Sequence, residues 1–179
     1  GLKVLTNLEF KRNWGLGSSS TLINNISNWL NIDPYKFLKM TYKGSGYDIA
    51  VAKTKKSIFF EKKGEFNKVM QTNFSPPFKD NLFFIHLNKK VDTQSEVIRF
   101  LNYKNEYGNE ILKINSLGEM IVKEKNQKQF NEMIKEHEEI ISKIIYKKPI
   151  QSTHFKDFYG QIKSLGSWGG DFILASGDN

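Results

Sequence analysis

The sequence predicts an α+β fold with two layers of secondary structure in each half of the chain. Apolar residues with strand-like and helix-like spacing follow in the order strand, helix, helix, strand, and then strand, helices, strand. Two adjacent prolines, Pro76 and Pro77, would break any regular element between these two series. We therefore expect two domains, formed by residues 1–78 and 79–179.

Three elements are expected at the start of the first half. Apolar residues alternate loosely with polar ones from Val4 to Phe10, which predicts a strand. Apolar residues three and four apart predict a helix from Thr21 to Leu30, and Ser18 to Ser20 are its N-cap candidates. Asp33, directly before a proline, predicts the start of a short helix from Tyr35 to Met40.

The first half is expected to continue with a third helix and a strand. Glycines in residues 44–46 predict a turn that runs into a helix of small residues ending near Ala52. Residues 57–60 follow as a predicted strand, and residues 61–65 as a turn.

The second half is expected to be mainly helical, with a strand at each end. The apolar run Leu82 to Leu87 predicts a buried strand, and Phe172 to Ala175 predicts another. Helices are predicted at Thr93 to Tyr103, Gln127 to Ile145 and Thr153 to Ser164. The residues expected to face the core from the last helix are Phe155, Phe158, Tyr159 and Ile162.

Composition favours anionic partners and excludes cysteine chemistry. The 27 Lys and Arg residues outnumber the 19 Asp and Glu residues, for a net charge of +8, which suits nucleotides, phosphorylated metabolites or nucleic acid. The lysines are scattered, which favours a solvated surface over a nucleic-acid track. The chain has no cysteine, no long apolar run and no signal-like N-terminus. We expect a cytoplasmic protein without a membrane or nucleic-acid partner.

The first chemistry-bearing segment lies directly before the helix predicted from Thr21. Glycines let backbone N–H groups approach a phosphate at a helix start, and serine hydroxyls can bind phosphate oxygens or Mg²⁺. The segment lacks the lysine of a Walker A loop and the third glycine of a dinucleotide fingerprint. By itself it suits a capped helix with a flexible lead-in equally well. Its residues are Gly15, Leu16, Gly17, Ser18, Ser19 and Ser20.

A second segment places a carboxylate behind two glycines, close to the start of the next helix. Asp48 could accept a proton from an attacking hydroxyl or orient it, although a lone aspartate there more often stabilises the helix dipole. The segment reads Gly44-Ser45-Gly46-Tyr47-Asp48.

A third segment, rich in glycine, precedes the last predicted strand. A helix C-cap at Gly166 followed by a tight turn is one interpretation. Three glycines in five positions exceed the need of a cap, which favours close approach of a ligand or of another backbone segment. The segment reads Lys163-Ser164-Leu165-Gly166-Ser167-Trp168-Gly169-Gly170-Asp171.

Together the three segments resemble the GHMP kinase family, which includes galactokinases and homoserine, mevalonate and phosphomevalonate kinases. Residues 15–20 match the family's phosphate-binding motif GLGSSA, and residues 44–50 are similar to the segment GSGFD or PSGVD that bears the catalytic aspartate. Residues 163–171 look like the motif K-x-x-G-A-G-x-G-G. A bacterial subgroup with a GYDIA signature, nearest to mevalonate and phosphomevalonate kinases, is most similar. Relative to the family we expect the chain to be truncated at both ends.

The resemblance implies an enzyme that uses ATP and Mg²⁺ to phosphorylate an alcohol or phosphate acceptor of the mevalonate or phosphomevalonate kind. It implies a ribosomal-protein-like first half and a ferredoxin-like second half. Asp48 would be the catalytic carboxylate, residues 15–20 would bind the nucleotide phosphates, and Ser19 would contact Mg²⁺. The residues implied to contact substrate and phosphates are Gly44, Ser45, Gly46, Gly166, Ser167, Trp168, Gly169 and Gly170.

Two other function classes stay open at this point. One is a GHMP-like domain that binds a nucleotide or metabolite without turnover, and the other is a nucleic-acid-binding domain, which only the charge favours. His137-Glu138-Glu139 resembles a zinc helix superficially, since the second histidine of a His-Glu-x-x-His motif is missing. Trp14 could stack on an adenine, but packing is the favoured role. The acceptor, the oligomeric state and the second Mg²⁺ ligand are left open.

Overall fold

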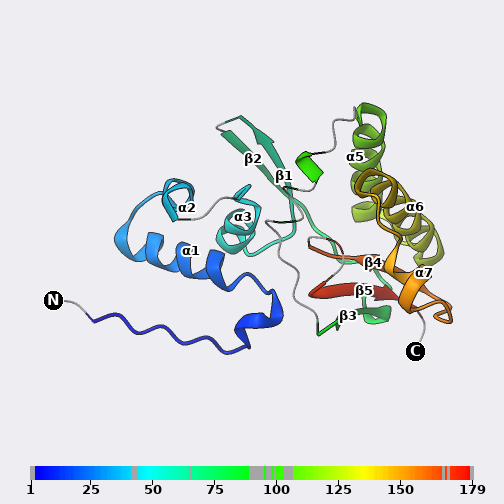
Figure 1. Cartoon of the computed structure of the whole chain (residues 1–179), viewed down its shortest axis with the longest axis horizontal. Coiled ribbons are helices and arrows are strands. Elements are labelled where there is room, and N and C mark those ends of the chain that lie inside the picture. Colours follow the sequence, from blue (N-terminus) through cyan, green and yellow to red (C-terminus); the bar gives the residue numbers. More distant parts are fainter. Residues whose placement is uncertain are drawn as a thin grey trace. The chain divides into compact units, whose positions relative to one another are not determined.

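The computed structural model describes residues 3–41, 44–64, 66–88, 95, 98, 100–102, 107–166, 168 and 170–177. Its helices and strands confirm the α+β class (Figure 1). The chain forms two compact units, unit 1 at Gly1–Phe74 and unit 2 at Ser75–Asn179. The division lies a few residues before the one suggested by the sequence, on the N-terminal side of the two prolines. Each unit is described by itself.

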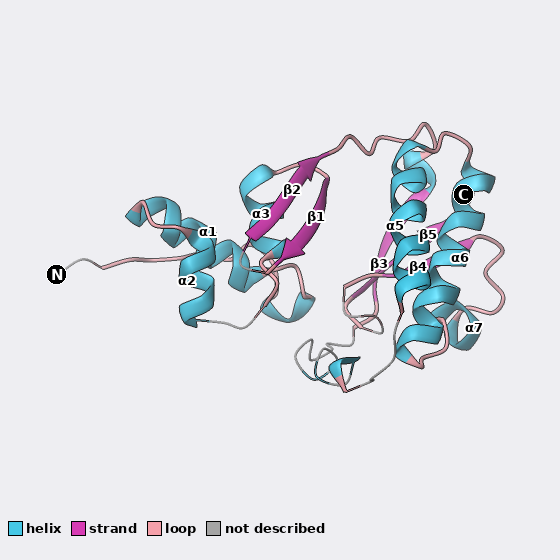
Figure 2. Cartoon of the chain, turned by 90° about the horizontal axis from the view of Figure 1, so that it is seen from above, coloured by secondary structure: helices cyan, strands magenta, loops and turns pink. Residues whose placement is uncertain are grey.

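Unit 1 consists of three α-helices and a two-stranded antiparallel sheet in its described part. Helix α1 packs against α2 and α3, and α3 also contacts β1. The two strands pair from Ile58↔Gln71 to Lys63↔Phe66 and form the hairpin seen in Figures 1 and 2. In chain order the elements are the 3₁₀ turn η1 (Arg12–Trp14), α1 (Ser18–Leu30), α2 (Pro34–Thr41), α3 (Tyr47–Thr54), β1 (Ile58–Lys63) and β2 (Phe66–Gln71).

Local signals explain where the helices of unit 1 begin and end. Asp33 caps α2, because its Oδ1 accepts from Tyr35 N at 2.7 Å and from Lys36 N at 3.1 Å. Helix α1 ends at Leu30, and the next residue, Asn31, caps it with a left-handed backbone, φ 53°. The helices predicted at the start of this half, and the one after residues 44–46, are therefore confirmed.

Three predictions for unit 1 are wrong. The strand predicted from Val4 to Phe10 does not form, because alternation alone does not supply a neighbouring strand to bond with. Residues 61–65 are not a turn throughout: β1 continues to Lys63, and β2 follows as a strand that the sequence reading missed. The N-cap of α1 is Gly17, so Ser18 to Ser20 lie inside the helix.

Unit 2 contains a three-stranded sheet in the order β3-β5-β4, with antiparallel neighbours. Helices α6 and α7 pack against β4, and α5 packs against α6 (Figure 1). The elements are the 3₁₀ turn η2 (Lys79–Asn81), β3 (Leu82–His86), α5 (Gly108–Lys123), α6 (Gln127–Ile145), α7 (Ile150–His154), β4 (Gln161–Ser164) and β5 (Phe172–Ser176).

Helix α6 is the central helix of unit 2 and has the predicted bounds. Asn126 caps it, with its side-chain oxygen accepting from Gln129 N at 3.1 Å. Its buried Phe130 lies 5.1 Å from the ring of Phe78, measured between ring centroids. Two apolar clusters complete the core: Leu117, Ile140 and Ile144 between α5 and α6, and Ile162, Ile173 and Ala175 in β4 and β5.

The predicted helix from Thr153 to Ser164 is wrong. Helix α7 ends at His154 and the chain then enters strand β4. Gln151 explains the change, because its side chain bonds the backbone of Phe158, Gly160 and Ile162 and holds that segment beside α7. The expected core residue Tyr159 is fully exposed.

The predicted strands of the second half are confirmed, but β3 is not buried. It forms one edge of the sheet, and Phe84 is 72% exposed. Helix α5 was not predicted. The predicted helix from Thr93 to Tyr103 lies largely outside the described residues.

Candidate functional site

The first glycine-rich segment leads directly into α1. Gly17 has a left-handed backbone with φ of 71°, which a residue with a Cβ adopts only at a cost. The first intrahelical bond joins Thr21 N to Gly17 O at 3.0 Å. The backbone N–H groups of Ser18, Ser19 and Ser20 therefore have no acceptor within the helix and lie at the positive end of its dipole.

The three serine hydroxyls at this helix start are not equivalent. Ser20 Oγ donates to Gly17 O at 3.1 Å, so it is engaged inside the segment. Ser18 is half-buried, and Ser19 is exposed. Ser19 therefore offers the most accessible hydroxyl for a phosphate oxygen or a metal ion.

Gly15 and Leu16 connect η1 to α1. Gly15 also has a left-handed backbone, with φ of 72°, at the end of η1. Leu16 and the neighbouring Trp14 are exposed. Trp14 is 36% exposed, so most of its surface is covered, which is compatible with the packing role favoured from the sequence.

One glycine of the second segment, Gly46, is required by packing within unit 1. Gly46 is buried with φ of 86°, and a Cβ there would lie 2.9 Å from Cδ1 of Tyr35. A Cβ on Gly44 would meet nothing within 4 Å. Ser45 Oγ accepts from Tyr47 N at 3.2 Å and supports the first turn of α3. Of the two glycines, only Gly46 is required by this local structure.

Asp48 lies in the first turn of α3 with an exposed side chain. Neighbouring atoms nevertheless crowd its carboxyl, and this partial desolvation raises the pKa of Asp48. The pKa of the adjacent Tyr47 is raised by burial and by the Asp48 charge. A raised pKa makes a carboxylate a better proton acceptor near neutral pH, while the same position also stabilises the helix dipole.

The structure brings the first two segments into one unit and leaves the third in the other. Helices α1 and α3 pack against each other in unit 1 (Figure 1), and each begins after a glycine with a left-handed backbone. Unit 1 thus contains two helix starts of the same kind, one with three serines and one with a carboxylate. Residues 163–171 belong to unit 2.

The third segment joins β4 to β5, which are antiparallel neighbours. The alternative of a helix C-cap at Gly166 is wrong, because a strand precedes this glycine. Gly166 has φ of 59°, and a Cβ there would meet nothing within 4 Å. Gly170 is buried. Ser167 and Gly169 lie outside the described residues.

Trp168 is the unexpected member of this loop. It is only 7% exposed although its backbone is left-handed, with φ of 61°. Its indole Nε1 donates to Glu138 Oε1 at 3.1 Å, and its backbone N donates to Leu165 O at 3.3 Å. The loop is therefore anchored to α6 through a buried side chain.

Glu138 is the centre of a buried polar cluster that sequence reasoning missed. Its Oε1 also lies 3.3 Å from Lys163 Nζ, and Lys163 Nζ is 3.2 Å from His137 Nδ1. Desolvation lowers the pKa of Lys163, an effect that the Glu138 charge opposes. Desolvation and the Lys163 charge lower the pKa of His137 to about 4.

A sequence signal for this cluster did exist. Phe130, Ile134 and Glu138 recur every four residues along α6 and are all about 1% exposed. A carboxylate at the third position of an apolar stripe indicates a buried polar partner. The partners Lys163 and Trp168 lie 25 and 30 positions away in sequence, and the stripe does not identify them.

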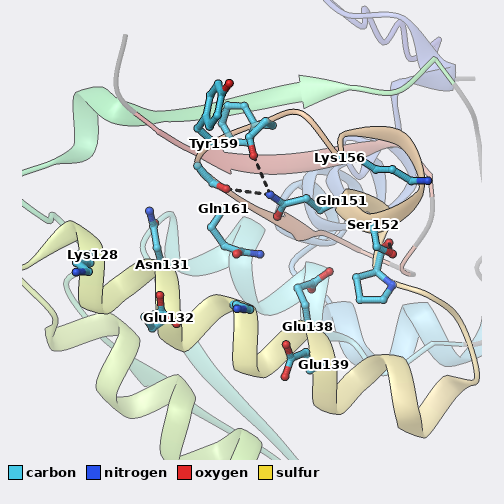
Figure 3. A pocket seen from close by; sticks show the side chains of 14 residues that line it. Lys128, Asn131, Glu132, Glu138, Glu139, Gln151, Ser152, Lys156, Tyr159 and Gln161 are labelled. Carbon is cyan, nitrogen blue, oxygen red and sulfur yellow. Dashed lines mark hydrogen bonds between the residues drawn. The ribbon is translucent and has the colours of Figure 1, made fainter.

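Unit 2 also contains a groove of about 740 Å³ beside α6, lined mostly by residues with charged or amide side chains (Figure 3). The dashed lines in Figure 3 mark the bonds that Gln151 donates to the backbone of residues 158 and 160. Lysines and glutamates alternate along it, including Lys128, Glu132 and Lys135. The groove contains no residue of the three glycine-rich segments, and its mixed charge does not select one ligand.

Other site classes have no support in the described residues. No group of three or more His, Cys, Asp or Glu there could hold a metal ion. Within the same residues, no helix has the length and apolar character needed to cross a membrane. Comparison with protein-family models, curated proteins and solved structures finds no match to this chain.

Proposed function

We propose that this chain is an ATP-dependent small-molecule kinase of the GHMP type. The observation that carries the proposal is the start of α1, where three serine N–H groups lack acceptors within the helix and follow a left-handed glycine. No acidic residue lies in this first turn. Such a helix start attracts a phosphate through its N–H groups and its dipole.

Asp48 supplies the chemical group that a phosphoryl acceptor needs. Its exposure leaves the carboxylate accessible, and its raised pKa favours proton acceptance. For an alcohol acceptor of the mevalonate kind, Asp48 would accept the hydroxyl proton. For a phosphate acceptor no base is needed, and Asp48 would position the acceptor.

Mg²⁺ would be held chiefly by the nucleotide phosphates. This ion prefers oxygen ligands and keeps several of its waters, and Ser19 offers an exposed hydroxyl at the α1 start. Bound Mg²⁺ would neutralise charge on the transferring phosphoryl group. The proposal assigns the loop at residues 166–170 to contacts with phosphate or acceptor. The cytoplasmic location expected from the sequence stays a prediction.

Turnover of MgATP against a panel of acceptors tests the proposal. The panel contains mevalonate, phosphomevalonate, homoserine and simple sugars, and each is tried with the wild type, Asp48→Ala and Asp48→Asn. We expect one acceptor class to be phosphorylated and both Asp48 variants to lose at least about a hundredfold in kcat if that acceptor is an alcohol. Asp80→Asn, an exposed aspartate of unit 2, is the matched control and should keep full activity.

The outcomes separate the two function classes. Binding of MgATP without turnover of any acceptor would favour the non-catalytic binding domain. Absence of MgATP binding, or equal binding after Ser19→Ala and Gly17→Val are combined, would contradict the assignment of the α1 start as the phosphate site.

A further inference from the structure

The groove of unit 2 has two walls, one formed by α6 and the other by residues 149–161 (Figure 3). Gln151 holds the second wall in place. Its amide nitrogen donates to Phe158 O at 3.3 Å and to Gly160 O at 2.9 Å. Its amide oxygen accepts from Ile162 N at 2.9 Å. The groove is therefore formed before any ligand arrives, as small-molecule sites usually are.

Two oxygen atoms on the α6 wall are buried and have no hydrogen-bond partner within the described residues. They are Oε2 of Glu138, a residue that is only 1% exposed, and Oδ1 of Asn131. Both residues line the groove, and Figure 3 shows both side chains projecting from α6 toward the other wall. A buried acceptor without a partner is costly, and native structures usually pair such an atom. These two atoms therefore favour a ligand that brings hydrogen-bond donors.

The charges around the groove disfavour an ionic ligand. Glu138 Oε1 already lies 3.3 Å from Lys163 Nζ and accepts from the Trp168 indole at 3.1 Å, so its charge is balanced within the protein. Exposed side chains of both signs line the groove. They are Lys128, Lys135, Lys156, Glu132 and Glu139. A cation or an anion would each meet like charges here, whereas a neutral donor would not.

A hydroxyl group is the neutral donor that matches both unpaired oxygens. It can donate to Glu138 Oε2, and because it also accepts, it can pair with Asn131 whichever way that amide is turned. The two residues are seven positions apart on α6, which is two turns and about 10 Å along the helix axis. A single sugar ring does not span this distance, whereas two linked rings do. The spacing therefore favours a disaccharide over a monosaccharide.

Tyr159 adds an exposed aromatic ring to the groove. It is fully exposed and lines both the main hollow and an adjoining one of about 670 Å³. Asn131 also lines both hollows, so the groove is elongated. The tyrosine ring offers an apolar face and a polar tip, and the C–H face of a sugar ring can pack on such an apolar face.

We propose that this groove binds a neutral polyhydroxylated ligand, a saccharide of about two rings. Its hydroxyls pair with Glu138 Oε2 and with Asn131, and one ring packs on Tyr159. The groove contains no residue of the three glycine-rich segments, so the proposal stands or falls separately from the kinase function. The rival explanation is that the unpaired oxygens bind only water molecules.

Amide chemical shifts of the full chain, recorded by NMR, measure the binding. The neutral probes are maltose, cellobiose and glucose, and the charged probes are ethanolamine and inorganic phosphate. We expect at least one disaccharide to bind with a Kd of about 1 mM, more tightly than glucose, and to shift amides of α6 and of residues 156–161. No shift with any saccharide at about 50 mM would overturn the proposal. Tighter binding of a charged probe, or saccharide shifts confined to α1 and α3, would also overturn it.

Asn131→Leu separates ligand binding from a structural role. Leucine has a similar size and removes a buried oxygen that has no partner, so we expect the unfolding temperature to stay the same or to rise. Affinity for the disaccharide should nevertheless fall about tenfold. Asn115→Leu, at an exposed position of α5 outside the groove, is the control and should bind as the wild type does. Unchanged affinity in Asn131→Leu would overturn the assignment of Asn131 to the site.

Tyr159→Ala tests the packing of a sugar ring. Because Tyr159 is fully exposed, its removal should leave the unfolding temperature unchanged while the affinity for the disaccharide falls about tenfold. Phe84→Ala removes an exposed aromatic ring of β3 outside the groove and should leave the affinity unchanged. Equal affinities of these two variants would overturn the contact with Tyr159.

Discussion

The two units differ in how much apolar surface they bury. Among the described residues, the buried apolar side chains of unit 1 are Ile23, Ile49 and Ala50. Those of unit 2 are more numerous, include the aromatic Phe78 and Phe130, and come mainly from α5, α6, β4 and β5. Burial of apolar surface is the main favourable term in folding, so unit 2 should be the more stable unit.

Both units expose large apolar side chains, including Phe84 and Tyr159 in unit 2 and the following three in unit 1. Met40 and Phe66 are more than 80% exposed, and Trp29 is 55% exposed. The proposed phosphate and acceptor groups, at the starts of α1 and α3, therefore lie on the less stable unit. Segments that bind ligands often come from the low-stability part of a structure. The comparison suggests that ligand binding would stabilise unit 1 more than unit 2.

A core substitution in unit 2 should have the largest effect on stability. Phe130 is 1% exposed and packs on Phe78, so Phe130→Ala should lower the free energy of unfolding by about 3–5 kcal/mol. Denaturant unfolding followed by circular dichroism measures it. Phe84→Ala, at a 72% exposed position of the same unit, is the control. If both variants lowered the free energy of unfolding by a similar amount, the expected difference between a core position and an edge-strand position of unit 2 would be wrong.

A glycine substitution should have the next largest effect, and it acts on unit 1. Gly46→Ala forces an alanine to adopt φ of 86° and places its Cβ 2.9 Å from the Tyr35 ring, at a cost of about 1–3 kcal/mol. Gly44→Ala meets nothing within 4 Å and should leave stability almost unchanged. Hydrogen exchange of α3 amides would locate the effect. Equal behaviour of the two variants would show that Gly46 is not required by packing.

The smallest expected effect is a pH dependence of the stability of unit 2 between pH 6.5 and 4. Desolvation and the Lys163 charge lower the pKa of His137 to about 4, below the 6.5 of the unfolded chain. As the pH falls from above 6.5 toward 4, the unfolded state gains a proton that the folded state does not, so stability decreases. Solvent screening at this partly exposed ring limits the loss to about 1–2 kcal/mol.

His137→Gln checks this origin, because its amide oxygen can still accept from Lys163 Nζ. We expect this variant to flatten the stability curve between pH 6.5 and 4, measured by denaturant unfolding at several pH values. His154→Gln, at an exposed position of α7, should keep the wild-type dependence. A curve unchanged by His137→Gln would assign the pH dependence to other groups.

The sequence by itself determined the elements whose signals are local. Helix α6 could be predicted to the residue, because its apolar stripe lies within the helix and its cap, Asn126, directly precedes it. The helix after Gly17 was predictable from its own apolar spacing, and the helix after Gly46 from the glycine turn that precedes it. The candidate phosphate-binding residues and the candidate catalytic carboxylate were predicted from these two helix starts and from the family resemblance of their residues.

Only the tertiary structure decided features that depend on distant partners. Residues 155–164 have helical spacing, yet Gln151 and the pairing of β4 with β5 hold Gln161–Ser164 as a strand. Residues 3–8 alternate as a strand would, yet they have no regular structure. The buried Glu138 meets Trp168 across thirty positions of sequence. The spacing of apolar residues along the chain shows which face of a helix or strand is apolar. Strand pairing and buried polar contacts depend instead on the residues that pack against that face in the folded chain.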